Sequence, residues 1–135
     1  KASNALSRIN QNARRNNQIS SCVFLPSVSA QDGYRSGEDA FLLIESEAKP
    51  EVAVYTAADG EALSSQCVHS ASRIPVGFFM KSEGRVELSF QTQGNDCDCW
   101  RFVDSQTGKR YSLTENITLD DVASGSGRFY LEKED

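Results

Sequence analysis

The sequence has 135 residues, 39% of them hydrophobic, which fits a single folded domain rather than two independent cores. No apolar run approaches the ~20 residues that a membrane helix needs, which excludes a helical membrane span. The net charge of −5 is unevenly divided, since four of the 14 basic residues and none of the 19 acidic residues precede Asp32. The acidic remainder disfavours nucleic acid as a partner, because affinity for phosphate backbones comes largely from Lys and Arg.

The first 19 residues are polar and basic, with many Asn, Ser and Gln residues. Leu6, Ile9 and Ala13 recur at helical spacing, so we expect residues 1–19 to form either a solvated linker or a short helix. The chain begins at Lys1 rather than Met, and we therefore expect a processed or excised piece of a longer protein.

Strand patterns begin after residue 19. Residues 22–25, 41–45 and 52–56 are rich in β-branched, aromatic and other apolar residues, which favours strands. Asp59 and Gly60 predict a turn before Ala62 and Leu63.

The clearest strand covers residues 85–91, where Val86, Leu88 and Phe90 alternate with polar or charged residues. Residues 74–80 precede it, and residues 82–84 predict a turn, so we expect these two segments to form a hairpin. Pro75 has no backbone N–H and must lie at a strand start or a sheet edge.

Residues 99–103 and 110–113 predict another hairpin, in which Gly108 supplies a positive φ. Residues 116–119 and 128–131 are two further strands, separated by the turn-rich residues 124–127. About nine short strands result, so the fold class that we expect is all-β, an antiparallel β-sandwich over residues 20–135.

The cysteines are even in number, which is typical of small exported β domains that form disulfides in an oxidising compartment. Cys97 and Cys99 would point to the same side of an extended strand, and a bond between them would close a strained ring. We therefore expect one or two long-range bridges, for example from Cys67 to Cys97 or Cys99; the possible members are Cys22, Cys67, Cys97 and Cys99.

The sequence does not predict an enzyme. His69 is the single histidine, so any Ser-His or Cys-His pair would need it, and no Gly-x-Ser-x-Gly motif accompanies it. The carboxylate pairs Glu38–Asp39 and Asp120–Asp121 are adjacent and would point to opposite faces of a strand. We assign no catalytic residue; a small hydrolase is the least favoured alternative.

Two metal sites are weaker alternatives, and we predict no cofactor. Zinc could be held by Cys67 and His69 together with Cys97 and Cys99, if the two strands pair. Calcium could be held by the loop oxygens of Asn95, Asp96 and Asp98, although the spacing of an EF-hand is absent and an Asx-type turn explains them more simply.

Sugar binding would need exposed aromatic rings, and the candidate binding residues are Trp100, Tyr111 and Tyr55, with Tyr34 also aromatic. Trp100 and Phe102 share one face of their strand. We expect this larger aromatic face to be core, which would place Trp100 inside.

The order of several segments is similar to that of the C-terminal sandwich domains of large secreted or surface proteins of Bacteroidetes. The similar segments are residues 37–40, 54–63, 74–78, 102–104, 107–109, 111–113 and 128–131. This resemblance implies a non-catalytic accessory or interaction domain at the C-terminal end of an exported protein, which serves display, attachment or adhesion. Its partners would be upstream domains of the same polypeptide and a protein or glycan at the cell surface. The alternative is a carbohydrate-binding module with an aromatic platform.

Overall fold

The structure is a computed structural model, and it describes residues 8–26, 40–41, 51–58, 61–68, 73–94 and 99–134. All regular elements of these residues are strands, which confirms the all-β prediction. Their bounds are β1 Arg8–Arg15, β2 Gln18–Pro26, β3 Ala40–Phe41, β4 Val52–Ala58, β5 Glu61–Val68, β6 Arg73–Met80, β7 Gly84–Gln93, β8 Trp100–Asp104, β9 Lys109–Ser112, β10 Ile117–Val122 and β11 Gly125–Lys133.

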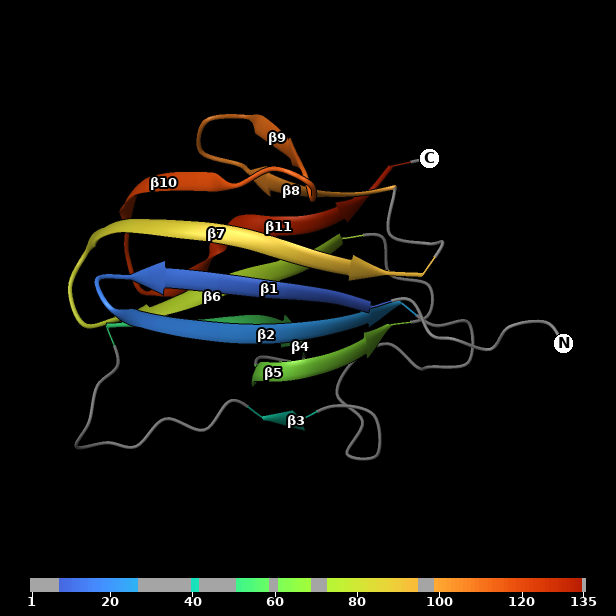
Figure 1. The fold of residues 1–135 in the computed structure, drawn as a ribbon, viewed down its shortest axis with the longest axis horizontal. Helices are drawn as coiled ribbons and strands as arrows, with labels where there is room; N and C mark the ends of the chain where they lie inside the picture. Colours follow the sequence, from blue (N-terminus) through green and yellow to red (C-terminus); the bar gives the residue numbers. More distant parts are fainter. Residues whose placement is uncertain are drawn as a thin grey trace, which may run out of the picture.

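One hydrogen-bonded path joins the strands in the order β10-β7-β1-β2-β5-β4-β6-β11-β8-β9, and β3 pairs with β5 beside it. This path folds over to form a sandwich (Figure 1). We call β10, β7, β1 and β2 the front layer and β4, β6, β11, β8 and β9 the rear layer. β5 lies where the path passes between them, parallel to β2 and antiparallel to β4.

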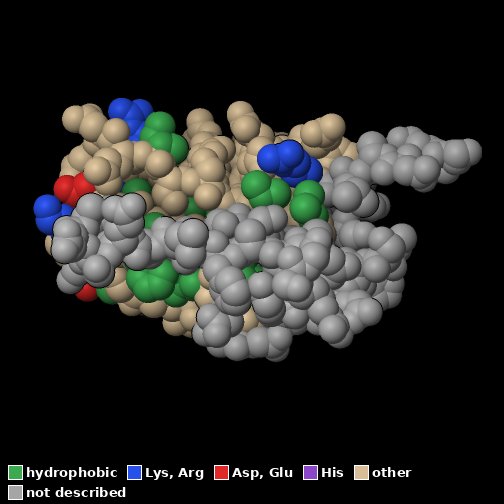
Figure 2. Space-filling model, turned by 90° about the horizontal axis from the view of Figure 1, so that it is seen from below, with side chains coloured by type: hydrophobic (Ala, Val, Ile, Leu, Met, Phe, Trp, Pro, Cys, Tyr) green, Lys and Arg blue, Asp and Glu red, His purple; other side chains and the backbone are tan. Residues whose placement is uncertain are grey.

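The core lies between the layers and is built by period-two alternation. The front layer contributes residues such as Phe24 and Leu88, and the rear layer contributes residues such as Phe78 and Phe102. Aromatic pairs join the layers, since the rings of Phe24 and Trp100 lie 4.8 Å apart at an angle of 72°. Seen from below, apolar side chains of the described residues reach the surface at several places (Figure 2).

The prediction of a linker or short helix over residues 1–19 is wrong for residues 8–19, the part of this range that the structure describes. Residues 8–15 form β1, a strand inside the front layer that pairs with both β2 and β7. Ile9 and Ala13 point into the core, but Gln11 stands between them and hides the apolar alternation. Backbone pairing on both sides stabilises a strand here, whatever the local preference of the residues.

The hairpin expected from residues 74–80 and 85–91 is also wrong. β6 pairs with β4 and β11 in the rear layer, whereas β7 pairs with β1 and β10 in the front layer. Residues 81–83 do change the chain direction, but they carry it from one layer to the other. The turn was recognisable in the sequence and the partner strand was not.

Two local predictions are confirmed. β8 and β9 form the expected antiparallel hairpin, and Gly108 in its turn has a φ of 78°. Pro75 is the third residue of β6, near the start of that strand. The pairing of β6 with β4 ends at Val76, so Pro75 has no partner residue in β4. The predicted turn at Asp59 and Gly60 lies outside the described residues, although β4 and β5 pair on either side of it.

Candidate functional site on the front face

The outer surface of the front layer carries a set of uncharged and charged polar side chains. They alternate with the core residues of the same strands, so they all point away from the sandwich. We call this set the front-face polar set; it consists of Asn10, Asn12 and Arg14 of β1, Ser21 of β2, Glu87, Ser89 and Gln91 of β7, and Thr118 of β10.

Strand register brings these residues together in rows. Asn12 of β1 lies opposite Ser89 of β7 on one side and Ser21 of β2 on the other. In the neighbouring row, Glu87 of β7 lies between Arg14 of β1 on one side and Thr118 of β10 on the other. Directly opposed side chains on neighbouring strands are close enough to contact one ligand together.

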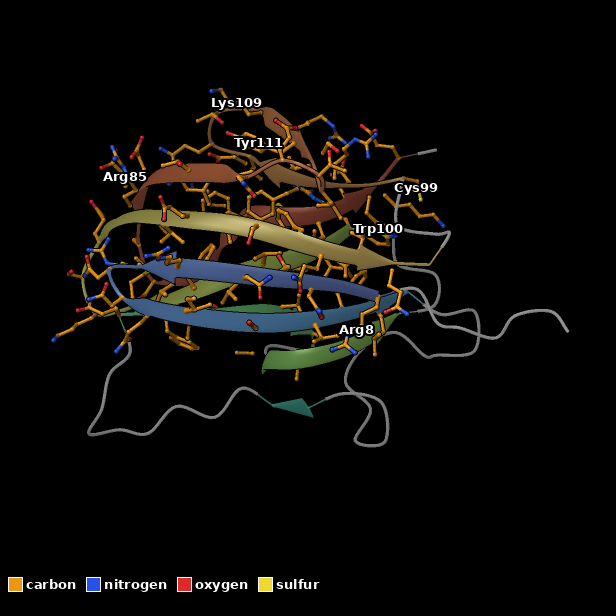
Figure 3. All side chains as sticks on the ribbon, in the orientation of Figure 1. Arg8, Arg85, Cys99, Trp100, Lys109 and Tyr111 are labelled. Atoms are coloured by element: carbon orange, nitrogen blue, oxygen red, sulfur yellow. The ribbon has the colours of Figure 1, made fainter. Side chains whose placement is uncertain are left out.

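Two open hollows lie along this face. The larger, of about 390 Å³, is lined by Asn12, Arg14, Ile19, Glu87, Ser89 and Thr118, with Asn116 and the core residues Leu88 and Ile117 beneath them. The smaller, of about 330 Å³, is lined by Arg8, Asn10, Gln91, Thr92 and Gln93. Arg8 and Arg85 mark opposite ends of this face in Figure 3.

Few of these groups bind one another. The Ser21 hydroxyl donates to Asn12 Oδ1 over 2.7 Å, and Arg14 Nε donates to the carbonyl of Asn16 over 3.4 Å. Within the described part of the chain, the side chains of Glu87, Ser89 and Thr118 form no hydrogen bond or salt bridge with the protein. Their donors and acceptors are turned to solvent.

The outer surface of the rear layer is different. Arg110 contacts Glu132 over 2.8 Å and Glu134 over 2.9 Å, so two carboxylates share one guanidinium. Arg73 also pairs with Glu132, over 3.5 Å, and its Cζ atom lies 3.7 Å from the ring centre of Tyr130. Hydrogen bonds to Glu132 and Glu134 raise the pKa of Arg110.

A partly buried ion pair fixes the rear layer to the end of β10. Arg128 Nε and Nη2 each lie 3.0 Å from a different oxygen of Asp104, which is 3% exposed. Arg128 Nη1 also donates to the carbonyls of Asp120 and Asp121. Burial acts to raise the pKa of Asp104, but hydrogen bonds from Arg128 and the Gln106 amide outweigh it, so the pKa lies below its usual value.

The three candidate binding aromatics do not form a shared platform. Trp100, 2% exposed, lies in the core as the alternation predicted (Figure 3). Tyr55 is 6% exposed; its ring covers Gly77 and lies 4.9 Å from the ring of Phe79, and burial raises its pKa. Tyr111 is half-buried on β9, at the other edge of the rear layer. Neither Trp100 nor Tyr55 offers a ring face on which a sugar could stack, so their assignment to a binding platform is wrong.

The predicted disulfide framework is not seen among the described cysteines. No disulfide joins Cys22 and Cys99, whose side chains the structure describes. Cys22 is a buried thiol that donates to the Leu63 carbonyl over 3.6 Å, and burial raises its pKa to about 12. The Cys67 side chain and Cys97 lie outside the described residues.

The other site candidates fall largely outside the described residues as well. These are His69 of the zinc set, Asn95, Asp96 and Asp98 of the calcium set, and the additional aromatic Tyr34. Within the described ranges, no three His, Cys, Asp or Glu side chains gather where they could hold a metal ion.

The front-face polar set was missed because residues 8–15 were interpreted as linker or helix. A signal was present in the sequence, since Asn10, Asn12 and Arg14 follow one another at a spacing of two residues.

No helix among the described residues is long and apolar enough to cross a membrane. Comparisons with known protein families, with curated proteins and with solved structures found no match for this chain.

Proposed function

We propose that this chain is a non-catalytic interaction domain of a larger exported bacterial surface protein, and that it contacts its partner through the front face. The observation that carries the proposal is the pair of open hollows lined by polar side chains; in the larger one, Glu87, Ser89 and Thr118 bind no other group of the described protein. Such groups are available to a partner without the loss of an internal contact.

The remaining support comes from the sequence. The ordered resemblance to C-terminal sandwich domains of Bacteroidetes surface proteins favours display, attachment or adhesion at the cell surface. Because those domains accompany other domains, we expect upstream domains of the same polypeptide to bring the front face to its partner.

Binding of the fluorescently labelled chain to intact Bacteroidetes cells tests this proposal by flow cytometry. We expect saturable binding that the double variant Asn12→Ala/Ser89→Ala weakens strongly, because both side chains line the larger hollow. The control variant Gln106→Ala/Lys109→Ala changes two exposed side chains at the β8–β9 turn and should bind normally.

Absence of binding to cells, or equal weakening by both double variants, contradicts the proposal. Hydrolysis of an ester or glycoside substrate that disappears in a His69→Ala variant would contradict its non-catalytic part.

A further inference from the structure

From the chemistry of the larger hollow, we infer that its ligand is an uncharged, hydroxyl-rich glycan. The inference rests on the proposed function and names the class of ligand for the same face. It depends on the kinds of groups that the hollow presents, on their balance of charge, and on the position of the hollow within the sheet.

Donors and acceptors alternate across the floor of the hollow. Arg14 provides only donors, Glu87 opposite it provides only acceptors, and Asn12 provides both. Ser89 and Thr118 add hydroxyl groups that can donate or accept. Neighbouring hydroxyls of a sugar ring also donate and accept, so one ring can bridge the two strands by hydrogen bonds in both directions.

The charges of the hollow cancel. Arg14 and Glu87 contribute one charge of each sign, and Arg85, the next cation along β7, is occupied by Asp120 over 2.8 Å. The whole chain carries a net charge of −5, which repels an anionic polymer. An uncharged ligand therefore complements this site better than a phosphate, sulfate or uronate chain.

An apolar wall completes the hollow. Ile19 of β2 is 68% exposed, although it lies among polar neighbours, and it lines the hollow beside Arg14. The C–H face of a sugar ring is apolar. Its contact with Ile19 would remove apolar surface of the sugar and of the Ile19 side chain from water, which favours binding. This aliphatic contact takes the place of the aromatic platform that Trp100 and Tyr55 do not provide.

The position of the hollow disfavours an extended peptide. Peptides that bind to sheets add as a new strand at an edge and use its free backbone groups. β1 and β7, which form the centre of the hollow, are paired on both sides: β1 with β2 and β7, and β7 with β1 and β10. β10, which ends the strand path, lines the hollow through Ile117 and Thr118. At β1 and β7, recognition must therefore rely on side chains, as it does for a glycan on a sheet face.

Affinity electrophoresis of the full chain tests the inference. The gels would contain dextran, mannan, xylan or mixed-linkage β-glucan as neutral probes and dextran sulfate as the anionic probe. We expect at least one neutral polysaccharide to slow the native chain. Glu87→Gln should weaken that binding about tenfold, because hydrogen bonds to a charged carboxylate are replaced by weaker ones to a neutral amide oxygen. Glu83→Gln is the matched control; it removes the same charge at the exposed 81–83 turn and should leave binding unchanged.

Retardation by dextran sulfate alone, or by no probe, or equal loss of binding in the two Gln variants would overturn the inference. Treatment of the cells separates this failure from failure of the proposed function. If binding to cells survives periodate oxidation of sugar diols but is lost after protease treatment, the partner is a protein. The inference of a glycan ligand is then wrong, whereas the proposed function as an interaction domain is kept. If the chain does not bind cells at all, the proposed function itself fails.

Discussion

The two layers of the sandwich differ in how many of their polar residues bind one another. On the rear layer, Arg110 and Arg73 are tied to Glu132, and Arg128 is tied to the buried Asp104. On the front layer, Glu87, Ser89 and Thr118 lie on the same face but bind no other side chain within the described residues. Polar groups that satisfy one another stabilise the fold, whereas polar groups left to solvent are free to bind a ligand.

The largest effect on stability should come from the ion pair of the rear layer. Arg128→Met leaves the carboxylate of Asp104 buried without its partner, and we expect a loss of about 3–5 kcal/mol in the free energy of unfolding. Urea denaturation followed by Trp100 fluorescence measures it. Arg85→Met is the front-layer control, since its pair with Asp120 is exposed and should contribute no measurable stability. Equal losses in the two variants would remove the distinction between the surfaces.

The same pair should make stability depend on pH. The pKa of Asp104 is lower in the folded chain than its ordinary value, so the ionised carboxylate stabilises the fold above the unfolded pKa of about 3.9. That stabilisation is lost as the pH falls through the lower, folded pKa. Urea midpoints measured between pH 7 and pH 2 should therefore fall more steeply for the native chain than for Asp104→Asn. Parallel curves for the two proteins would show that Asp104 does not cause the slope.

A smaller effect is expected at Gly77 in β6, on the outer side of the rear layer. A methyl group added there would overlap the ring of Tyr55, so Gly77→Ala should destabilise the fold by about 1–3 kcal/mol. Gly84→Ala is the matched variant, because the group it meets is the end of the Arg15 side chain, which can move aside. Thermal unfolding compares the two, and a larger loss at Gly84 would contradict the close packing of Tyr55 on Gly77.

The smallest effect should follow changes in the front-face polar set. Ser89→Ala and Thr118→Val remove hydroxyl groups that bind no partner within the described ranges, so each should change stability by less than about 0.5 kcal/mol. Chemical denaturation provides the measurement. Losses similar to that of Arg128→Met would mean that these residues maintain the fold, and the proposed binding role would lose its basis.

Local features were predictable because they depend on neighbouring residues. The alternation of Val86, Leu88 and Phe90 identified β7 and its buried side, and Gly108 identified the β8–β9 turn. The same alternation placed Trp100 in the core. The site could not be predicted in this way, because its residues come from four strands, β1, β2, β7 and β10, and β7 and β10 are far from β1 and β2 along the chain.

The sequence alone determined that this chain is built from strands, that the chain turns before β7 and between β8 and β9, and which side of each clear strand is buried, because side-chain alternation is a property of neighbouring residues. The turn expected at residues 124–127 is wrong, since β11 already begins at Gly125. Only the tertiary structure decided that residues 8–15 are a strand inside the front layer and that β6 and β7 belong to different layers. Strand pairing joins backbones that are distant along the chain, so no local pattern specifies it.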